Sequence, residues 1–193
     1  MDQGTKEVKP EVNPAEPKTG PLAHPLFHVV LHEPEIPNNT GNIGRTCVAT
    51  ACRLHLIRPL GFDTSDHACR RAGLDYWPRL GVREHDSWDD YLAAENPPRF
   101  WFLSTKARRS VFDTDFQRGD ALVFGKETRG LPASLTDRYP DRAVVLPMVP
   151  AERSLNVATA VCAVVYEGVR QLLAKGVIQS RDDRRLNIDQ TTS

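Results

Sequence analysis

The sequence predicts an α/β fold with a mainly parallel sheet flanked by helices. Short, β-rich apolar runs alternate with segments of helical periodicity along the middle of the chain, a pattern typical of strand–helix–strand units. The length of 193 residues corresponds to one domain with tails. We find no internal repeat, so a single α/β domain is expected.

The expected strands are short and their side chains mostly apolar. They cover residues 27–31, 54–57, 99–103, 121–124 and 143–146. Helical patterns cover residues 40–52, 87–95 and 155–174, and a Pro-rich loop of residues 33–39 precedes the first of them. The periodicity of apolar residues distinguishes the two kinds of element.

The last expected helix, residues 155–174, has apolar side chains nearly all the way round. Such a helix is buried on more than one side. In so small a domain, one side would cover the sheet and the other a second subunit, which predicts a homodimer through this C-terminal helix. A fully internal helix is the alternative.

Both ends of the chain differ in composition from its middle. Residues 1–26 contain five of the 15 prolines and no aromatic residue, so we expect a disordered tail. Its lysines precede no apolar stretch, which excludes a secretory signal. Residues 27–178 form the expected folded domain, and the polar residues 179–193 are expected to fray.

The charge and hydropathy of the chain exclude two classes of partner. The 25 Lys and Arg residues balance 25 Asp and Glu residues, so bulk electrostatics alone cannot bind nucleic acid. The mean hydropathy is −0.43 and no run of about 18 apolar residues occurs, which predicts no membrane-spanning helix. Any partner must therefore be recognised at local sites.

The cysteines and histidines form no sequence pattern of a metal site. The four cysteines lack a CxxC pair, and buried free thiols in a reducing cytoplasm are expected at Cys47, Cys52, Cys69 and Cys162. His24, His28 and His32 have helical spacing, but Pro25 and the β-rich residues after it disfavour a helix there. We expect these histidines to be structural or solvated, and we expect no metal.

Polar and glycine residues concentrate in three segments, 37–45, 124–132 and 146–156, that otherwise resemble strand-to-helix turns. Ligands bind beyond the carboxyl ends of strands in α/β sheets. The segments would form a cleft faced by Arg45, Glu127, Ser154 and Asn156. Alternatively, Gly125 and Gly130 supply turn conformations, and Ser154 or Asn156 caps the last helix.

Common nucleotide and hydrolase motifs are absent from the sequence. It contains no GxGxxG after the first strand, no GxxxxGK[ST], no HExxH and no GxSxG. A dinucleotide site, a P-loop and the common hydrolase sites are therefore unsupported.

The three segments resemble the motifs of a known family. Asn39-Thr40-Gly41-Asn42-Ile43-Gly44-Arg45, Phe124-Gly125-Lys126-Glu127-Thr128-Arg129-Gly130-Leu131-Pro132, and Leu146-Pro147-Met148 through Ser154-Leu155-Asn156-Val157 resemble the SPOUT (SpoU-type, α/β-knot) RNA methyltransferases. The resemblance covers residues 27 to about 174. Within the superfamily it points to the small bacterial tRNA wobble-nucleotide 2′-O-methyltransferases, which share residues 33–37 and 70–76. It implies an S-adenosylmethionine enzyme with a C-terminal deep trefoil knot.

The resemblance also implies roles for individual residues. The cofactor would lie against the main chain and side chains of Leu103, Gly125, Leu146, Met148, Ser154 and Leu155. A ribose 2′-hydroxyl would attack the sulfonium methyl, and Arg45 would stabilise the forming alkoxide, because a guanidinium rarely gives up its proton. Asn39 and Glu127 would orient Arg45 or the ribose. Ser154 and Asn156 would complete the hydrogen bonding.

The expected RNA contacts are local, since the chain has no added RNA-recognition domain. Arg70, Arg71 and Arg129 would bind phosphates and Tyr76 would stack on a base. Lys106, Arg108 and Arg109 form a second cluster that either binds phosphates or is only solvated. The predicted substrate is the anticodon loop of tRNA, methylated at the wobble nucleotide, cytidine or modified uridine 34. The alternatives are another tRNA or rRNA site, or a catalytically silent RNA-binding protein.

Overall fold

The computed structural model describes residues 24–65 and 76–188. Seven strands form one sheet in the order β3-β2-β1-β6-β4-β7-β5, and every pairing in it is parallel. The strands are β1 (His28–His32), β2 (Arg53–Ile57), β3 (Arg83–His85), β4 (Phe100–Leu103), β5 (Arg109–Ser110), β6 (Ala121–Phe124) and β7 (Ala143–Val145). The predicted α/β fold with a parallel sheet is confirmed.

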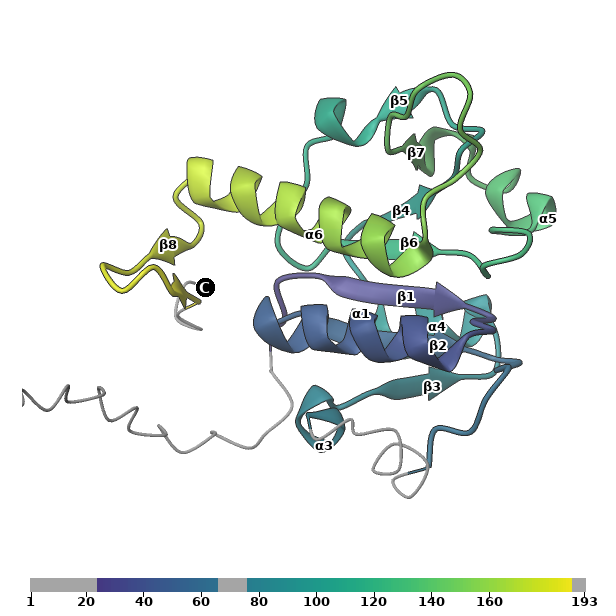
Figure 1. Cartoon of the computed structure of the whole chain (residues 1–193), viewed down its shortest axis with the longest axis horizontal. Helices are drawn as coiled ribbons and strands as arrows, with labels where there is room; N and C mark the ends of the chain where they lie inside the picture. Colours follow the sequence, from purple (N-terminus) through teal and green to yellow (C-terminus); the bar gives the residue numbers. More distant parts are fainter. Residues whose placement is uncertain (1–23, 66–75, 189–193) are drawn as a thin grey trace, which may run out of the picture.

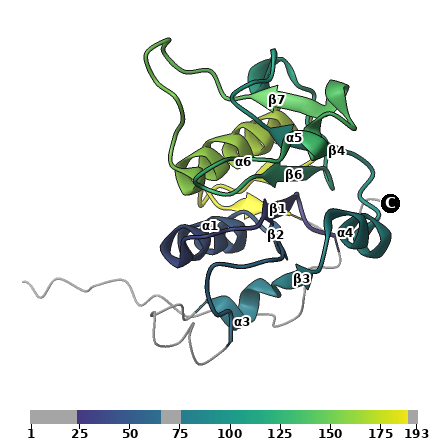
Figure 2. The ribbon, with the colours of Figure 1, turned by 90° about the vertical axis from the view of Figure 1, so that its right-hand side faces the viewer.

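Helices cover both faces of the sheet (Figures 1 and 2). Helices α1 (Pro37–Ala49) and α6 (Val157–Ala174) pack together on one face, and α4 (Trp88–Glu95) covers part of the other. The remaining helical turns are α3 (Trp77–Leu80), α5 (Ala133–Thr136), η1 (Val111–Asp113) and η2 (Pro140–Arg142).

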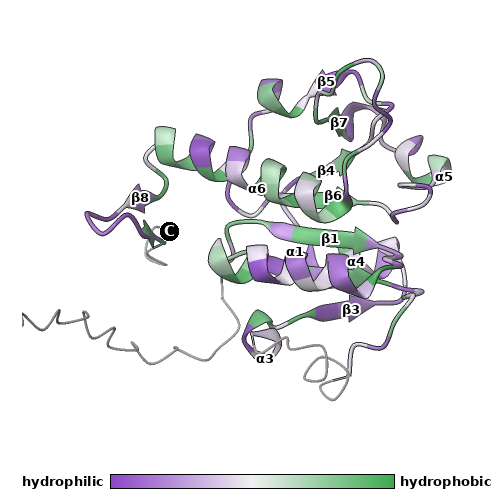
Figure 3. Ribbon diagram, viewed as in Figure 1, coloured by the Kyte–Doolittle hydropathy of each residue, from purple (hydrophilic) through white to green (hydrophobic). Residues whose placement is uncertain are grey.

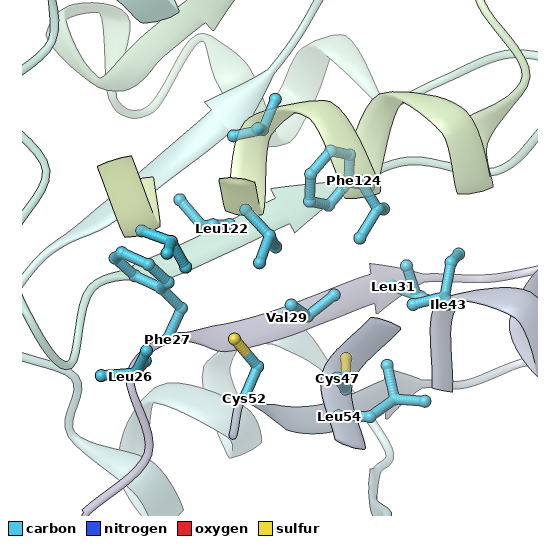
Figure 4. Packing of buried hydrophobic residues seen from close by; sticks show 14 of the residues in the cluster. Leu26, Phe27, Val29, Leu31, Ile43, Cys47, Cys52, Leu54, Leu122 and Phe124 are labelled. Carbon is cyan, nitrogen blue, oxygen red and sulfur yellow. The ribbon is translucent and has the colours of Figure 1, made fainter. Parts of the chain in front are cut away.

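The core divides into two clusters because successive side chains of a strand point to opposite faces. Val29, Leu31 and Leu54 join the cluster under α1 and α6 (Figure 4). Val30 and Ile57 join the cluster under α4. Figure 3 shows the central strands β1, β4 and β6 in hydrophobic colours and the edge strand β3 in hydrophilic ones. This explains why β3, with two exposed charged residues, was not predicted.

Helix α1 begins three residues earlier than predicted, at Pro37 instead of Thr40. Proline suits the first turn of a helix because it lacks an N–H that would have no partner there. Asn39 consequently lies on the helix and not in a loop. Gly44 lets α1 approach α3, since a Cβ at this position would lie 2.8 Å from Leu80 Cδ2.

Helix α6 begins at Val157, two residues later than predicted, and Asn156 caps it. Its buried side includes Val161, Val164 and Val169, while Tyr166 is 49% exposed. A Cβ at Gly168 would lie 2.5 Å from Phe27 Cζ, so the helix packs directly on the start of β1. The alternative of a fully internal helix is therefore not met.

The prediction of no membrane-spanning helix stays a prediction, although α6 is long and apolar enough to cross a membrane by length and composition alone. Among the described residues, this 18-residue helix has a mean hydropathy of 1.4. Core helices meet the same criteria, and α6 packs against α1 with seven of its residues buried.

Both ends of the domain extend beyond the predicted boundaries. Leu26 is fully buried, and its N–H donates to Ala51 O at 2.9 Å. Residues 179–188 form a hairpin of β8 (Gln179–Ser180) and β9 (Leu186–Asn187) where fraying was predicted. Leu186 and Ile188 pack against the core, which explains why these residues form a hairpin and do not fray. Residues 1–23 of the predicted tail, which was expected to cover residues 1–26, lie outside the described residues.

The described cysteines are free thiols, as predicted. Cys47 and Cys52 are buried and Cys162 is half-buried. Burial raises the pKa of Cys52 to about 11, so its thiol is neutral. Cys69 lies outside the described residues.

Candidate active site

A cavity of about 1070 Å³ opens at the carboxyl ends of β4, β6 and β7. Its volume lies just above the usual range of about 300–1,000 Å³ for small-molecule sites. All predicted cofactor-binding residues line it, namely Leu103, Gly125, Leu146, Met148, Ser154 and Leu155. Asn39, Glu127, Arg129 and Asn156 line it as well. The three polar segments therefore meet at one site.

Gly125 is required by the tight course of the loop that follows β6. A Cβ at this position would lie 2.0 Å from Gly130 C and 2.1 Å from Leu131 N, so no other residue fits. Gly130, with φ +68°, closes the loop by donating its N–H to Lys126 O at 2.8 Å. The loop thereby presents main chain to the cavity.

The Glu127 carboxylate accepts three hydrogen bonds at the start of α1. The donors are Glu35 N at 2.9 Å, Ile36 N at 3.2 Å and Asn39 Nδ2 at 3.0 Å. Ile36, the residue that precedes α1, provides no side-chain cap, so Glu127 supplies one and places negative charge at the positive end of the helix dipole. Glu127 therefore orients Asn39 and α1.

Asn39 passes this connection on to the third segment. Its Oδ1 accepts from Asn156 Nδ2 at 2.9 Å. Asn156 Oδ1 in turn accepts from Ala158 N at 2.9 Å and Thr159 N at 3.3 Å at the start of α6. Asn156 is thus both a helix cap and part of the site. We call the connection Glu127–Asn39–Asn156 the carboxamide chain.

Two further contacts join the segment after β1 to the loop after β6. Glu35 accepts from Thr128 N and Thr128 Oγ1, both at 3.1 Å, and Lys126 Nζ lies 2.6 Å from Glu33 Oε2. The predicted site did not include Glu33, Glu35 or Thr128. No sequence signal could have paired residues 93 positions apart.

Arg45 lies on the exposed side of α1 and does not line the cavity. Its guanidinium carbon is 5.0 Å from the ring centre of Tyr76, a cation–π distance. Tyr76 is 4% exposed and its hydroxyl donates to Gly41 O. The expectation that Tyr76 stacks on RNA is therefore unsupported, because the ring is buried beneath Arg45. Arg70 and Arg71 lie outside the described residues.

Histidines from three strands form a second polar cluster, under α4. His28 Nδ1 and His55 Nε2 are 2.9 Å apart, and His55 Nδ1 and His85 Nε2 are 3.0 Å apart. We call this the histidine chain. Burial lowers the pKa of His28 to about 4 and also lowers the pKa of His55 and His85. The rings are therefore neutral at pH 7. Of the two predicted roles for His28, structural or solvated, the structure supports the structural one.

Ligand atoms of His28, His55 and Glu95 lie within 4.8 Å of one another, a grouping that could hold a metal ion. Glu95, however, accepts from Arg83 Nη1 at 2.7 and 2.9 Å, and Arg53 Nη1 lies 4.0 Å away. Two guanidinium groups oppose a further cation at this place. The predicted absence of a metal stays a prediction.

The fold and the cavity define a class of protein, a parallel α/β domain that binds its ligand in loops at the carboxyl edge of the sheet. Residues 26–166 match the model of the SpoU rRNA Methylase family. The chain belongs to this family.

Similar proteins cover most of the domain. The chain is 48% identical over 154 residues to the tRNA (cytidine(34)-2'-O)-methyltransferase of Escherichia coli K12, covering 79% of this chain and 98% of that protein. It is 50% identical over 149 residues to the enzyme of the same name from Burkholderia pseudomallei, covering 76% and 96%.

Solved structures have the same fold. One, described as "Structural insights into the 2-OH methylation of C/U34 on tRNA", has a TM-score of 0.71 at 44% identity and covers 80% of this chain and 99% of that one. The SpoU methyltransferase AviRb from Streptomyces viridochromogenes, in complex with AdoMet, has a TM-score of 0.66 at 27% identity and covers 80% and 60%. The resemblance read from the sequence is thereby confirmed at the level of the family.

Proposed function

We propose that this chain transfers the methyl group of S-adenosylmethionine to the ribose 2′-hydroxyl of the wobble nucleotide, cytidine or modified uridine 34, of tRNA. The observation that carries the proposal is the carboxamide chain, which joins all three polar segments around one cavity. The names of the relatives at 48–50% identity support the same activity and substrate.

The cavity fits the cofactor in its size and in the chemistry of its lining. Leu103, Leu146, Met148 and Leu155 offer apolar surface for an adenine ring and an aliphatic chain, and Gly125 allows the main chain to approach closely. Main-chain N–H and C=O groups are suited to the polar edge of a base. When bound, the cofactor would supply an electrophilic methyl group, and the S–CH3 bond that breaks would leave S-adenosylhomocysteine as the product.

Arg45 stabilises the negative charge that develops on the attacking ribose oxygen. A guanidinium stays protonated, so it acts through charge and hydrogen bonding and not as a base. Tyr76 holds the side chain by stacking beneath it. Because Arg45 does not line the cavity of its own chain, the RNA must extend over α1, or a second copy must bring its cavity to Arg45.

A homodimer through α6 is part of the proposal. Tyr166 on α6 is 49% exposed, so the outer face of the helix offers an aromatic side chain to a partner. The trefoil knot of the C-terminal part and a cytoplasmic location belong to the proposal on the strength of the family resemblance.

The test combines methylation of tRNA with nucleoside mapping. The chain is incubated with unmodified tRNA and labelled S-adenosylmethionine, and 2′-O-methylated nucleotide 34 is expected. Arg45→Ala should keep cofactor affinity and lose methyl transfer, whereas Arg181→Ala, on the distant hairpin, should retain activity. Label on a base, no label on any RNA, or normal turnover by Arg45→Ala would contradict the proposal.

Methylation of a different RNA site is the second candidate function, because the description of the matched family names rRNA. Ribosomal RNA as a parallel substrate separates the two. Label that appears only on ribosomal RNA would favour this candidate, and a failure to bind the cofactor would favour a catalytically silent protein.

A further inference from the structure

Several basic residues of the chain form ion pairs, whereas four of those that line the cavity form none with a described carboxylate. Away from the cavity, several form ion pairs with carboxylates, as in Arg58–Glu84 at 2.7 Å, Arg99–Asp120 at 2.8 Å and Arg170–Glu167 at 2.8 Å. Within the described part of the chain, the cavity-lining residues Lys106, Arg108, Arg109 and Arg129 have no carboxylate within 4.0 Å. Unpaired positive charge therefore gathers at the cavity.

The cavity lining has a surplus of positive charge, although the whole chain is neutral. Five basic residues line it, against the acidic residues Glu127, Asp137 and Asp141. Glu127 already accepts the hydrogen bonds of α1, and Lys126 is paired with Glu33. The remaining cations exceed what the single carboxylate of the cofactor requires.

Three of these cations, Lys106, Arg108 and Arg109, lie within six residues of the end of β4. Ser104 shapes this segment, because its Oγ accepts from Lys106 N and its O accepts from Ala107 N, both at 3.2 Å. Lys106 and Arg108 are exposed on this turn. We call these three residues the basic rim.

Arg109 extends the basic rim onto β5, the edge strand of the sheet. Its guanidinium carbon lies 5.7 Å from the ring centre of Trp101, and that of Arg142 lies 5.5 Å from the same ring. Stacking on an indole fixes the direction of a guanidinium but leaves its charge and N–H donors available. Two arginines held on one ring without a carboxylate are suited to an anionic ligand.

We infer that the basic rim binds the phosphate backbone of the RNA strand that flanks the target ribose, an inference that rests on the proposed function. Phosphate contacts position a nucleic acid and carry no sequence information, so the rim sets the register in which one ribose reaches the cavity. A chain with zero net charge needs such a local contact, because its overall field does not attract RNA.

The experiment compares two variants of the full chain that each lack two positive charges. Lys106→Ala/Arg108→Ala removes exposed residues of the basic rim. Arg181→Ala/Arg185→Ala is the matched control, because these residues are 65% and 76% exposed on the hairpin, which lies at the opposite end of the molecule from β5 (Figure 1). Binding of unmodified tRNA without cofactor is measured from 50 to 200 mM salt, together with cofactor affinity and steady-state kinetics.

We expect the rim variant to bind tRNA about 10-fold more weakly and to lower the slope of log K against log salt by about 1.4, as two lost single-strand phosphate contacts require. KM for tRNA should rise while kcat and cofactor affinity stay unchanged, and the control should match the wild type. Equal effects in both variants, or a loss of cofactor affinity in the rim variant, would overturn the inference. If the wild type binds tRNA through the rim but methylates no nucleotide 34, the proposed function fails and the inference stands.

Discussion

The carboxamide chain and the histidine chain are both series of side-chain hydrogen bonds between distant segments, but they differ in charge and exposure. The carboxamide chain starts from an ionised carboxylate and lines a cavity. In the histidine chain, His55 is fully buried and its burial lowers the pKa. The first can position a ligand, whereas the second only joins strands. A series of hydrogen bonds between polar side chains therefore does not by itself identify a functional site. The side chains must also be accessible to a ligand.

The largest expected effect concerns the loop that carries Glu127. In Gly125→Ala, the Cβ would lie 2.0 Å from Gly130 C, so the loop must move. We expect loss of cofactor binding and a decrease of more than about 3 kcal/mol in the free energy of unfolding. Gly130→Ala is the control, because nothing lies within 4 Å of its Cβ and its positive φ costs about 1–2 kcal/mol. Urea unfolding and calorimetric cofactor titration measure both, and equal behaviour of the two variants would contradict this account.

Acid should destabilise the fold through the histidine chain. Burial lowers the pKa of His28 from 6.5 to about 4, so the unfolded chain takes up the proton first as the pH falls. The stabilisation is complete above pH 6.5 and is lost between pH 6.5 and 4, amounting to about 3 kcal/mol for this residue. Urea unfolding at pH 7.5, 6 and 5 measures the slope.

Two variants connect this pH dependence to its residue. His28→Gln should make the profile less steep, and His24→Gln, at an exposed position, should leave it unchanged. A flat profile in the wild type would show that the histidine chain accepts a proton in the folded state.

Glu127→Ala tests the carboxamide chain directly. It leaves two main-chain N–H groups and the Asn39 amide without their acceptor. We expect a loss of about 2 kcal/mol in stability, as for a removed helix cap, and an approximately 100-fold decrease in methyl transfer from displacement of Asn39 and Asn156. Thr136→Ala, which removes a local bond on α5, is the control. Unchanged turnover in Glu127→Ala would show that the carboxamide chain is not needed for methyl transfer.

The smallest effect is expected for Lys126→Met. The Lys126–Glu33 ion pair is 27% exposed on both sides, so solvent screening limits its value to less than about 1 kcal/mol. Methyl transfer should change less than twofold. A larger loss of activity with intact stability would place the Lys126 charge among the groups that act on the ligand.

The helices and strands with a clear pattern of apolar residues could be predicted from the sequence, and so could the motifs that line the cavity. Strands β1, β4 and β6 and helix α6 are apolar runs that periodicity identifies, and the cofactor-binding residues followed from the resemblance. Strand β3 was not predicted because Arg83 and Glu84 face solvent. The start of α1 was placed too late because Pro37 was assigned to a loop. The partners of Glu127 and His55 could not be predicted, since they depend on the register of strands that lie far apart in the chain.

The cap of α1 has a kinetic consequence. Glu127 lies about 90 positions after the N–H groups it accepts, so the first turn of α1 is stabilised only once β6 is in place beside β1. Contacts of such long sequence separation close late in folding. Slow exchange of the Glu35 and Ile36 amide hydrogens with solvent deuterium would therefore report, residue by residue, that the two loops have docked.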